Sequence, residues 1–264
     1  MTSNQPWFEA LWDDYSAMAP RVSAIKSRLE DRRESVLNDH IAFRTFDLDP
    51  VSLKNLGPVI ESLGYRPFGT YRFEAKKVRA VAYVSSEPNA PRIFLSELET
   101  AAFDDEIQEL IRDLVGQAKG LPVGPEVFLS GRPWSLTTAT YRRLAEVSEY
   151  AAWVAALGLR PNHFTVNVNA LSTFEGLPDL LDFVEALGFR LNESGGRIKG
   201  TPAQYLEQGA TLADRLVVDF MDAALEVPTC YYEFAYRHMM ADGRLFDGFV
   251  EASADKIFES TNVG

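Results

Sequence analysis

One short pattern occurs twice in this chain and constrains its fold more than any other feature. Residues 38–44 (NDHIAFR) and residues 161–167 (PNHFTVN) each place a histidine at the head of a segment of alternating apolar residues, which is typical of a β-strand. The chain has three histidines in 264 residues. Two of them at matched positions therefore indicate a duplicated structural unit.

The residues that follow the two histidines also match. Gly64 follows His40 by 24 residues, and Gly188 follows His163 by 25 residues. The two glycines lie in similar segments, ESLGYR and EALGFR. In each copy a helical pattern of apolar residues precedes the glycine, which is placed to end the helix. Two anchors in the same order and at nearly the same spacing predict two copies of one unit.

The first copy predicts the whole unit as strand, helix and three strands (βαβββ). A strand at 40–46 leads into a helix that opens at Asp49-Pro50, and three more strands are expected at 65–73, 78–85 and 92–98. For the second copy the patterns predict a leading strand at 163–169, a helix at 177–187 and later strands at 215–221 and 229–236.

Helical patterns outside the two units predict additional helices. Two are expected in residues 7–33, separated at Ala19-Pro20; one begins at residue 104 or 105, and one runs from residue 137 or 138 to 157. We expect an α+β fold with a single domain over residues 1–264. Its predicted segments are N-terminal helices (1–35), the first βαβββ unit (36–100), a helical connection (101–159), the second unit (160–240), and a C-terminal loop and helix (241–264).

Composition limits the classes of function. The chain is 46% hydrophobic, so it can bury a substantial core, and its net charge of −12 argues against non-specific binding to nucleic acid. The single cysteine, Cys230, excludes an intramolecular disulfide. No segment is typical of a secretion signal or a membrane span. We therefore expect a soluble cytoplasmic protein with no membrane or nucleic-acid partner.

Three residues form a candidate metal site. Two βαβββ units related by a pseudo-twofold axis would bring their leading strands together, and with them His40 and His163. Glu233 lies in the middle of a predicted strand between aromatic residues, where an unpaired charge is costly. Two imidazoles and one carboxylate are the ligand set of non-haem Fe(II) oxygenases, which leaves positions for substrate and dioxygen. The curved, barrel-like mixed sheet is therefore expected to surround a metal.

The segments around these residues resemble a known family. Residues 40–44 (HIAFR), 162–165 (NHFT) and 232–237 (YEFAYR) are similar to the 2-oxoadipate dioxygenase/decarboxylase family, formerly a domain of unknown function (DUF1338). That family belongs to the vicinal oxygen chelate superfamily and is distantly similar to hydroxymandelate synthase. The resemblance covers residues 36–240. The three segments are specific together, and each is weak alone.

The resemblance implies a ligand set, a substrate and a reaction. Fe(II) would be held by His40, His163 and Glu233, although Zn, Mn or Ni could occupy the site in the isolated protein. A substrate-anchoring arginine matches Arg44, and a pocket glutamine loosely matches Gln208. The implied reaction converts a 2-oxo dicarboxylic acid such as 2-oxoadipate, with O2, to a 2-hydroxy acid one carbon shorter (2-hydroxyglutarate) and CO2. It implies a role in lysine catabolism.

The position of Arg44 supports an anchoring role without the resemblance. Residues 40, 42 and 44 of one strand share a face, so Arg44 is expected to point into the same cavity as His40. Its guanidinium is suited to a carboxylate, which it can bind through two hydrogen bonds. A plainer role, an ion pair with Glu233 or an aspartate, is also open.

Other readings of the same residues remain open. The scaffold could support a lyase, an isomerase or a hydrolase that uses Zn²⁺ or Mn²⁺ as a Lewis acid, or a non-catalytic small-molecule-binding protein. The aromatic residues around Glu233, including Tyr231, are more typical of core packing than of a substrate pocket. Longer members of the family carry additional sequence around the two units, which leaves the exact substrate open. The sequence does not define the oligomeric state.

Overall fold

The structure, a computed structural model, describes residues 4–261. Two helices at the N-terminus, α1 (Gln5–Met18) and α2 (Pro20–Asp31), meet at Ala19, as predicted from the alanine-proline pair. The buried residues of α1 and α2 recur at steps of three and four, which is the spacing of one helical face. None of the helices within the described residues is long and apolar enough to cross a membrane.

The first copy of the repeat folds as predicted. It consists of β1 (Asn38–Phe46), α3 (Leu53–Ser62), β2 (Tyr65–Phe73), β3 (Val78–Ser85) and β4 (Arg92–Leu98). The helix starts later than expected, because Asp49 and Pro50 lie in a turn before Leu53. Gly64 adopts a φ of 83°, which suits glycine and lets the chain turn out of the helix.

The second copy has the same plan with one insertion. It contains β5 (Pro161–Asn167), α7 (Leu177–Ala186), β6 (Lys199–Thr201), β7 (Leu206–Ala210) and β10 (Tyr231–Arg237). Between β7 and β10 the chain forms a separate hairpin of β8 (Arg215–Asp219) and β9 (Ala224–Pro228). The strand predicted at 215–221 therefore exists but does not join the main sheet, which is a correction to the predicted unit.

The two copies form one continuous eight-stranded sheet with the order β2-β3-β4-β1-β5-β10-β7-β6. In each half the leading strand is parallel to the last strand of its own unit, β1 to β4 and β5 to β10. The two leading strands pair antiparallel at the centre. The strand order is thus the same from either edge, as expected for a duplicated βαβββ unit.

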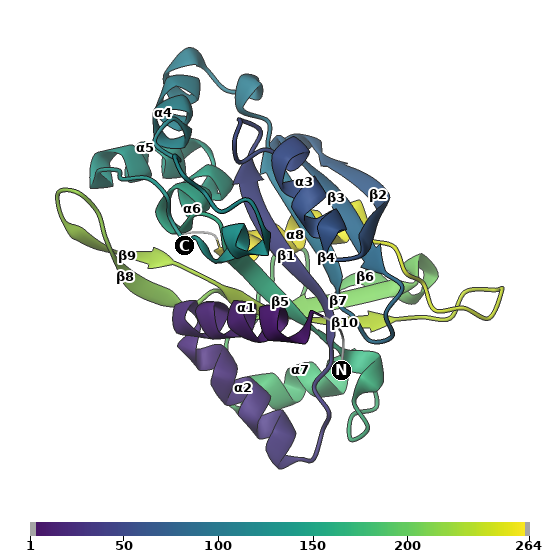
Figure 1. The fold of residues 1–264 in the computed structure, drawn as a ribbon. Coiled ribbons are helices and arrows are strands. Elements are labelled where there is room, and N and C mark those ends of the chain that lie inside the picture. Colours follow the sequence, from purple (N-terminus) through teal and green to yellow (C-terminus); the bar gives the residue numbers. More distant parts are fainter. Residues whose placement is uncertain (1–3, 262–264) are drawn as a thin grey trace.

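The sheet is curved, and one helix contacts both of its ends. In Figure 1 the helix α8 (Glu251–Ile257) lies behind the sheet, on the face opposite to α3. It contacts the edge strands β2 and β6 as well as β7. A flat sheet of eight strands would span more than 30 Å, so contact with both edges requires the sheet to curl around this helix. The inner face is therefore covered by the C-terminal segment.

The connection between the units is helical, as predicted, but contains one more break than expected. It includes α4 (Asp105–Val115), α5 (Thr138–Val147) and α6 (Glu149–Leu157). The single helix predicted from residue 137 or 138 to 157 is interrupted at Ser148, whose extended backbone and side chain cap the N-terminus of α6. The interruption turns α6 into the core, where all residues from Tyr150 to Leu157 are buried.

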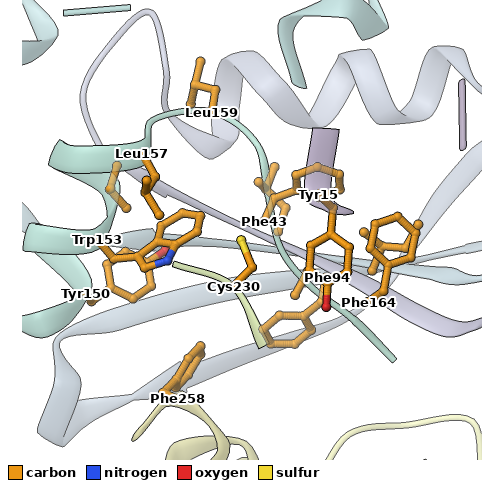
Figure 2. Packing of buried hydrophobic residues seen from close by; sticks show 14 of the residues in the cluster. Tyr15, Phe43, Phe94, Tyr150, Trp153, Leu157, Leu159, Phe164, Cys230 and Phe258 are labelled. Atoms are coloured by element: carbon orange, nitrogen blue, oxygen red, sulfur yellow. The ribbon is translucent and has the colours of Figure 1, made fainter. Parts of the chain in front are cut away.

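Aromatic side chains from distant segments fill the core. Figure 2 shows Tyr150 and Trp153 of α6 near Cys230, and the ring of Phe258 lies 6.2 Å from that of Tyr150. Tyr15 of α1 packs on Phe164 of β5, with ring centroids 4.8 Å apart. The N-terminal helix α1 therefore covers the outer face of the central strands.

Candidate metal centre

The three predicted ligands converge at the centre of the inner face. His40 lies on β1, His163 on β5 and Glu233 on β10, and these strands are neighbours in the sheet. One ligand atom from each residue lies within 4.8 Å of the others, and all three side chains are buried. Nε2 of His163 is 3.1 Å from Oε2 of Glu233, and Nε2 of His40 is 3.6 Å from Oε1.

The residue before each histidine fixes the orientation of its ring. Nδ1 of His40 is 2.8 Å from Oδ1 of Asp39, and Nδ1 of His163 is 3.0 Å from Oδ1 of Asn162. A carboxylate can only accept, so His40 donates its Nδ1 hydrogen and presents the lone pair of Nε2 to the interior. Outer partners of this kind orient histidine ligands in metal sites.

The charge state of the three residues is suited to a cation. Burial lowers the pKa of His163 to about 4, so the ring is neutral near pH 7. Burial alone would raise the pKa of Glu233, but the neighbouring histidines lower it below its usual value, so the carboxylate is charged. The charged carboxylate lies within 3.6 Å of Nε2 of both histidines, an arrangement that a divalent cation stabilises. The residues present therefore fit a metal with a two-histidine, one-carboxylate ligand set.

Gln208 supports the carboxylate from the neighbouring strand. Its Nε2 donates to Oε1 of Glu233 over 2.6 Å, while its own Oε1 has no hydrogen-bond partner among residues 4–261. Gln208 also borders the small cavity beside the three ligands, together with His40, Phe94, His163, Glu233, Phe249, Ala254, Ile257 and Phe258. The cavity measures about 20 Å³, which holds about one water molecule.

Arg44 lies on the same face of β1 as His40 but does not border that cavity. Its guanidinium is buried and paired with Glu149 at 3.5 Å, not with Glu233 or an aspartate. It also donates to Oγ1 of Thr261 at 3.1 Å and to the Phe258 carbonyl at 3.5 Å. The rings of Tyr150, Trp153 and Phe258 lie 5.0–5.4 Å from its Cζ. The C-terminal segment thus separates Arg44 from the ligand set.

Tyr231 lies beside His163 on the inner face of the sheet. It lies on β10 two residues before Glu233, and its ring stacks on His163 with centroids 4.6 Å apart and an interplanar angle of 25°. Burial raises the pKa of Tyr231 well above 10, and the positive charge of nearby Arg44 acts in the opposite direction. Tyr231 lies opposite His163 in the pairing of β10 with β5, so its side chain faces the same interior as Arg44.

Two supporting residues were not predicted. Asp39 forms an ion pair with Arg237, whose Nε lies 2.6 Å and whose Nη2 lies 2.9 Å from the Asp39 oxygens. Burial would raise the pKa of Asp39, but Arg237 and His40 hold it well below its usual range. The sequence contains a signal for the residues that orient the histidine rings, because Asp39 and Asn162 precede the two histidines at equivalent positions.

The third histidine, His238, pairs with Glu207 at 2.7 Å and is not one of the converging residues.

Larger surface hollows lie elsewhere. One of about 580 Å³ is lined by residues such as Asp47, Lys54 and Arg72, and one of about 650 Å³ by residues such as Arg190 and Glu193. Neither includes any of the three converging residues. The buried ligand set, and not the largest hollow, is therefore the candidate functional site.

Comparison with known proteins gives consistent matches. A sequence model of the 2-oxoadipate dioxygenase/decarboxylase family matches residues 9–121 and 126–246. The chain is 32% identical over 253 residues to the chloroplastic 2-oxoadipate dioxygenase/decarboxylase of Arabidopsis thaliana. That match covers 84% of this chain and 67% of the relative.

Two solved structures share the fold over nearly the whole chain. The hydroxyglutarate synthase of Oryza sativa, crystallised in complex with 2-oxoadipate, has a TM-score of 0.93 and 30% identity, covering 98% of this chain and 91% of that one. A protein of Shewanella frigidimarina, for which a hydrolase function has been suggested, has a TM-score of 0.88 and 43% identity, covering 96% and 99%.

Proposed function

Because the chain belongs to the 2-oxoadipate dioxygenase/decarboxylase family, we propose that it is an Fe(II)-dependent enzyme acting on 2-oxoadipate or a closely related 2-oxo dicarboxylic acid. The observation that carries the proposal is the convergence of His40, His163 and Glu233 within 4.8 Å of one another on the inner face. The relative from Oryza sativa was crystallised with 2-oxoadipate, which supports this class of substrate.

The overall reaction balances without a further reductant. One 2-oxoadipate and one O2 give one 2-hydroxyglutarate and one CO2. The carboxylate next to the keto group leaves as CO2, and the keto carbon becomes the carboxylate of the shortened acid. One oxygen atom of O2 enters this new carboxylate and the other enters the new hydroxyl group. Bound iron would supply the positions for the 2-oxo group and dioxygen and the redox chemistry of this conversion.

The protein's own residues hold and orient the ligand set. His40 and His163 each donate Nδ1–H to the preceding residue, so their Nε2 atoms face the same point. Gln208 holds one oxygen of Glu233 by donating its amide. This fixed arrangement keeps the three ligand atoms in place before a metal arrives, which reduces the conformational entropy lost on binding.

Substrate binding requires the C-terminal cover to move. We use this name for residues 251–261, which form α8 and the short 3₁₀ helix Phe258–Thr261. Ala254, Ile257 and Phe258 of the cover border the cavity beside the ligands. A cavity of about 20 Å³ cannot hold a six-carbon acid. In this proposal the cover opens to admit the acid and then closes over it, which excludes water from the site.

The arginine of the inner face is proposed as a substrate anchor. Arg44 is fully buried. Its pair with Glu149 is long, at 3.5 Å, and its other two partners, Thr261 and the Phe258 carbonyl, belong to the cover. Movement of the cover removes two of these three partners. A substrate carboxylate can then replace them, because a guanidinium binds a carboxylate through two charge-assisted hydrogen bonds.

The test is anaerobic loading with Fe(II), followed by measurement of O2 uptake with a panel of 2-oxo acids, 2-oxoadipate first. We expect uptake with 2-oxoadipate, together with CO2 and 2-hydroxyglutarate in equal amounts. Iron binding without O2 uptake for any acid would refute the dioxygenase proposal and favour a lyase, isomerase or hydrolase on this scaffold. Failure to bind any divalent metal would favour a non-catalytic binding protein.

A further inference from the structure

Tyr231 is placed as a pocket residue although its aromatic neighbours suggested core packing. Residues 231, 233 and 235 of β10 share one face of the strand, so Tyr231 points to the same side as Glu233. Its ring lies against His163, and the residue is fully buried. Tyr232, on the opposite face of the strand, packs against Trp12 and Phe234.

Around Arg44 two buried donors lack a partner among residues 4–261, and so does one buried acceptor, Oε1 of Glu149. The hydroxyl hydrogen of Tyr231 and the Nε hydrogen of Arg44 have no acceptor among residues 4–261, although the Tyr231 oxygen interacts with the Arg44 guanidinium. Leaving a buried donor unsatisfied is unfavourable, so such groups in native proteins normally have a partner that binds them. The Tyr231 oxygen could accept from Arg44, but its own hydrogen would still need an acceptor. A group that only accepts satisfies both donors at once, and a carboxylate is such a group.

The free edge of the guanidinium is suited to that carboxylate. Nη1 of Arg44 binds Thr261 and Glu149, whereas Nη2 has only the Phe258 carbonyl at 3.5 Å. Nε and Nη2 together form one edge of the fork, and this edge binds a carboxylate through two parallel hydrogen bonds. The Phe258 carbonyl belongs to the C-terminal cover, so opening of the cover exposes this edge.

The position of Arg44 along β1 indicates which end of the substrate it binds. Arg44 lies four residues beyond His40, which corresponds to about 13 Å along the strand. The candidate metal ligands occupy one end of this stretch and Arg44 the other, and Tyr231 lies between them, level with Ala42 in the sheet. A 2-oxo dicarboxylic acid has its 2-oxo group at one end and a second carboxylate at the other. The two ends of such a molecule therefore match the two ends of the inner face.

We propose that Tyr231 donates its hydroxyl hydrogen to the remote carboxylate of the substrate, beside Arg44, and thereby selects dicarboxylic over monocarboxylic 2-oxo acids. This inference rests on the proposed function, because it assigns one end of that substrate. Tyr231 is a binding residue in this scheme. It binds the remote carboxylate and does not contact the reacting carbons.

The test is Tyr231→Phe, which keeps the ring on His163 and removes only the hydroxyl. With 2-oxoadipate, we expect kcat/KM to fall about 10- to 100-fold, mainly through KM, the loss typical of a hydrogen bond to a charged group. With 2-oxohexanoate, which has a methyl group in place of the remote carboxylate, kcat/KM should stay within about twofold of the wild type. The iron content should be unchanged.

The matched control is Tyr232→Phe. Tyr232 is equally buried on the same strand, and its hydroxyl also has no partner within residues 4–261, but it faces away from the ligands. Its removal should leave the ratio between the two acids unchanged. A second readout needs no metal. Adipate should raise the melting temperature of the metal-free wild type more than that of Tyr231→Phe.

The outcomes separate this inference from the proposed function. If the wild type consumes no O2 with 2-oxoadipate, the proposed function fails. If the wild type is active but Tyr231→Phe keeps its preference for the dicarboxylic acid, the role of Tyr231 is wrong. Equal losses in Tyr231→Phe and Tyr232→Phe, or equal losses with both acids, would also overturn it, because the effect would then be structural.

Discussion

Phe94 occupies, in the first half of the sheet, the position that Glu233 occupies in the second. On β4 Phe94 lies opposite the residue two positions after His40, and on β10 Glu233 lies opposite the residue two positions after His163. Both side chains border the cavity at the ligand set. The duplicated fold therefore offers four such positions around the cavity, and in this chain three of them carry candidate metal ligands. Fewer protein ligands leave more positions on a metal for substrate and dioxygen.

This relationship predicts the effect of Phe94→Glu. A carboxylate at that position should act as a fourth protein ligand, so the variant should retain metal while O2 uptake falls by at least about tenfold. Metal analysis and an oxygen electrode give the two readouts. Phe94→Leu is the control, since it removes the same aromatic contacts with Phe249 without adding a ligand. If both variants lose activity equally, the effect comes from packing and not from coordination.

A second prediction concerns the ligands themselves. Loss of a residue that only hydrogen-bonds to a metal ligand typically lowers metal affinity about 10- to 100-fold. His163→Ala removes a ligand itself, so it should reduce the affinity for divalent metal by more than that. His238→Ala is the matched control, because His238 pairs with Glu207 away from the ligand set. Its metal content should equal that of the wild type. Stoichiometric metal in His163→Ala would show that this histidine is not a ligand.

The sequence predicted those features that repeat along the chain. The two histidines and the glycines Gly64 and Gly188 lie in matching segments, so the meeting of the two leading strands follows from the duplication. Glu233 could be selected because a charged residue in a strand of aromatic residues needs a partner. These are local patterns, or patterns compared between the two copies, and the fold preserves them.

Features that depend on distant segments were not visible in the sequence. Arg44 contacts Glu149 and Thr261, which lie 105 and 217 residues away, so no local pattern links them. Strand β6 has three residues and β7 contains Gly209, so both give weak strand signals. The alternation at residues 215–219 predicts a strand correctly, but alternation does not identify the strand with which it pairs.

A third prediction tests the ion pair beneath the metal centre. Asp39 and Arg237 are both buried, so Asp39→Asn leaves the guanidinium with backbone carbonyls but without its charged partner. The free energy of unfolding should fall by about 3 kcal/mol, measured by urea denaturation. The asparagine can also donate to Nδ1 of His40 and thus reverse the tautomer of the ring. Metal affinity should therefore fall about 10- to 100-fold.

The control for this variant is Asp242→Asn, at an exposed ion pair with Arg244. Exposed pairs contribute little to stability, so this variant should unfold like the wild type and bind metal equally well. If Asp39→Asn is as stable as Asp242→Asn, the buried pair does not stabilise the fold.

The last prediction concerns the C-terminal cover. Asn192 donates its amide to the Lys256 carbonyl and to Oγ of Ser260, each over 2.9 Å, and so ties the cover to the second unit. Loss of two hydrogen bonds in Asn192→Ala should raise the population of the open cover about 5- to 30-fold. Hydrogen exchange of peptides within 251–261 should become faster by that factor. Asn55→Ala is the control, because the Asn55 side chain in α3 donates to Asp49 and Ser52 and to no residue of the cover.

The same variant also tests whether opening is linked to substrate binding. If the acid enters only through the open form, a larger open population should speed its association by the same factor. Closure over the bound acid should in turn slow exchange of the 251–261 peptides in the wild type. Binding of 2-oxoadipate with no change in their exchange would contradict a moving cover, since the closed cavity has room for about one water molecule.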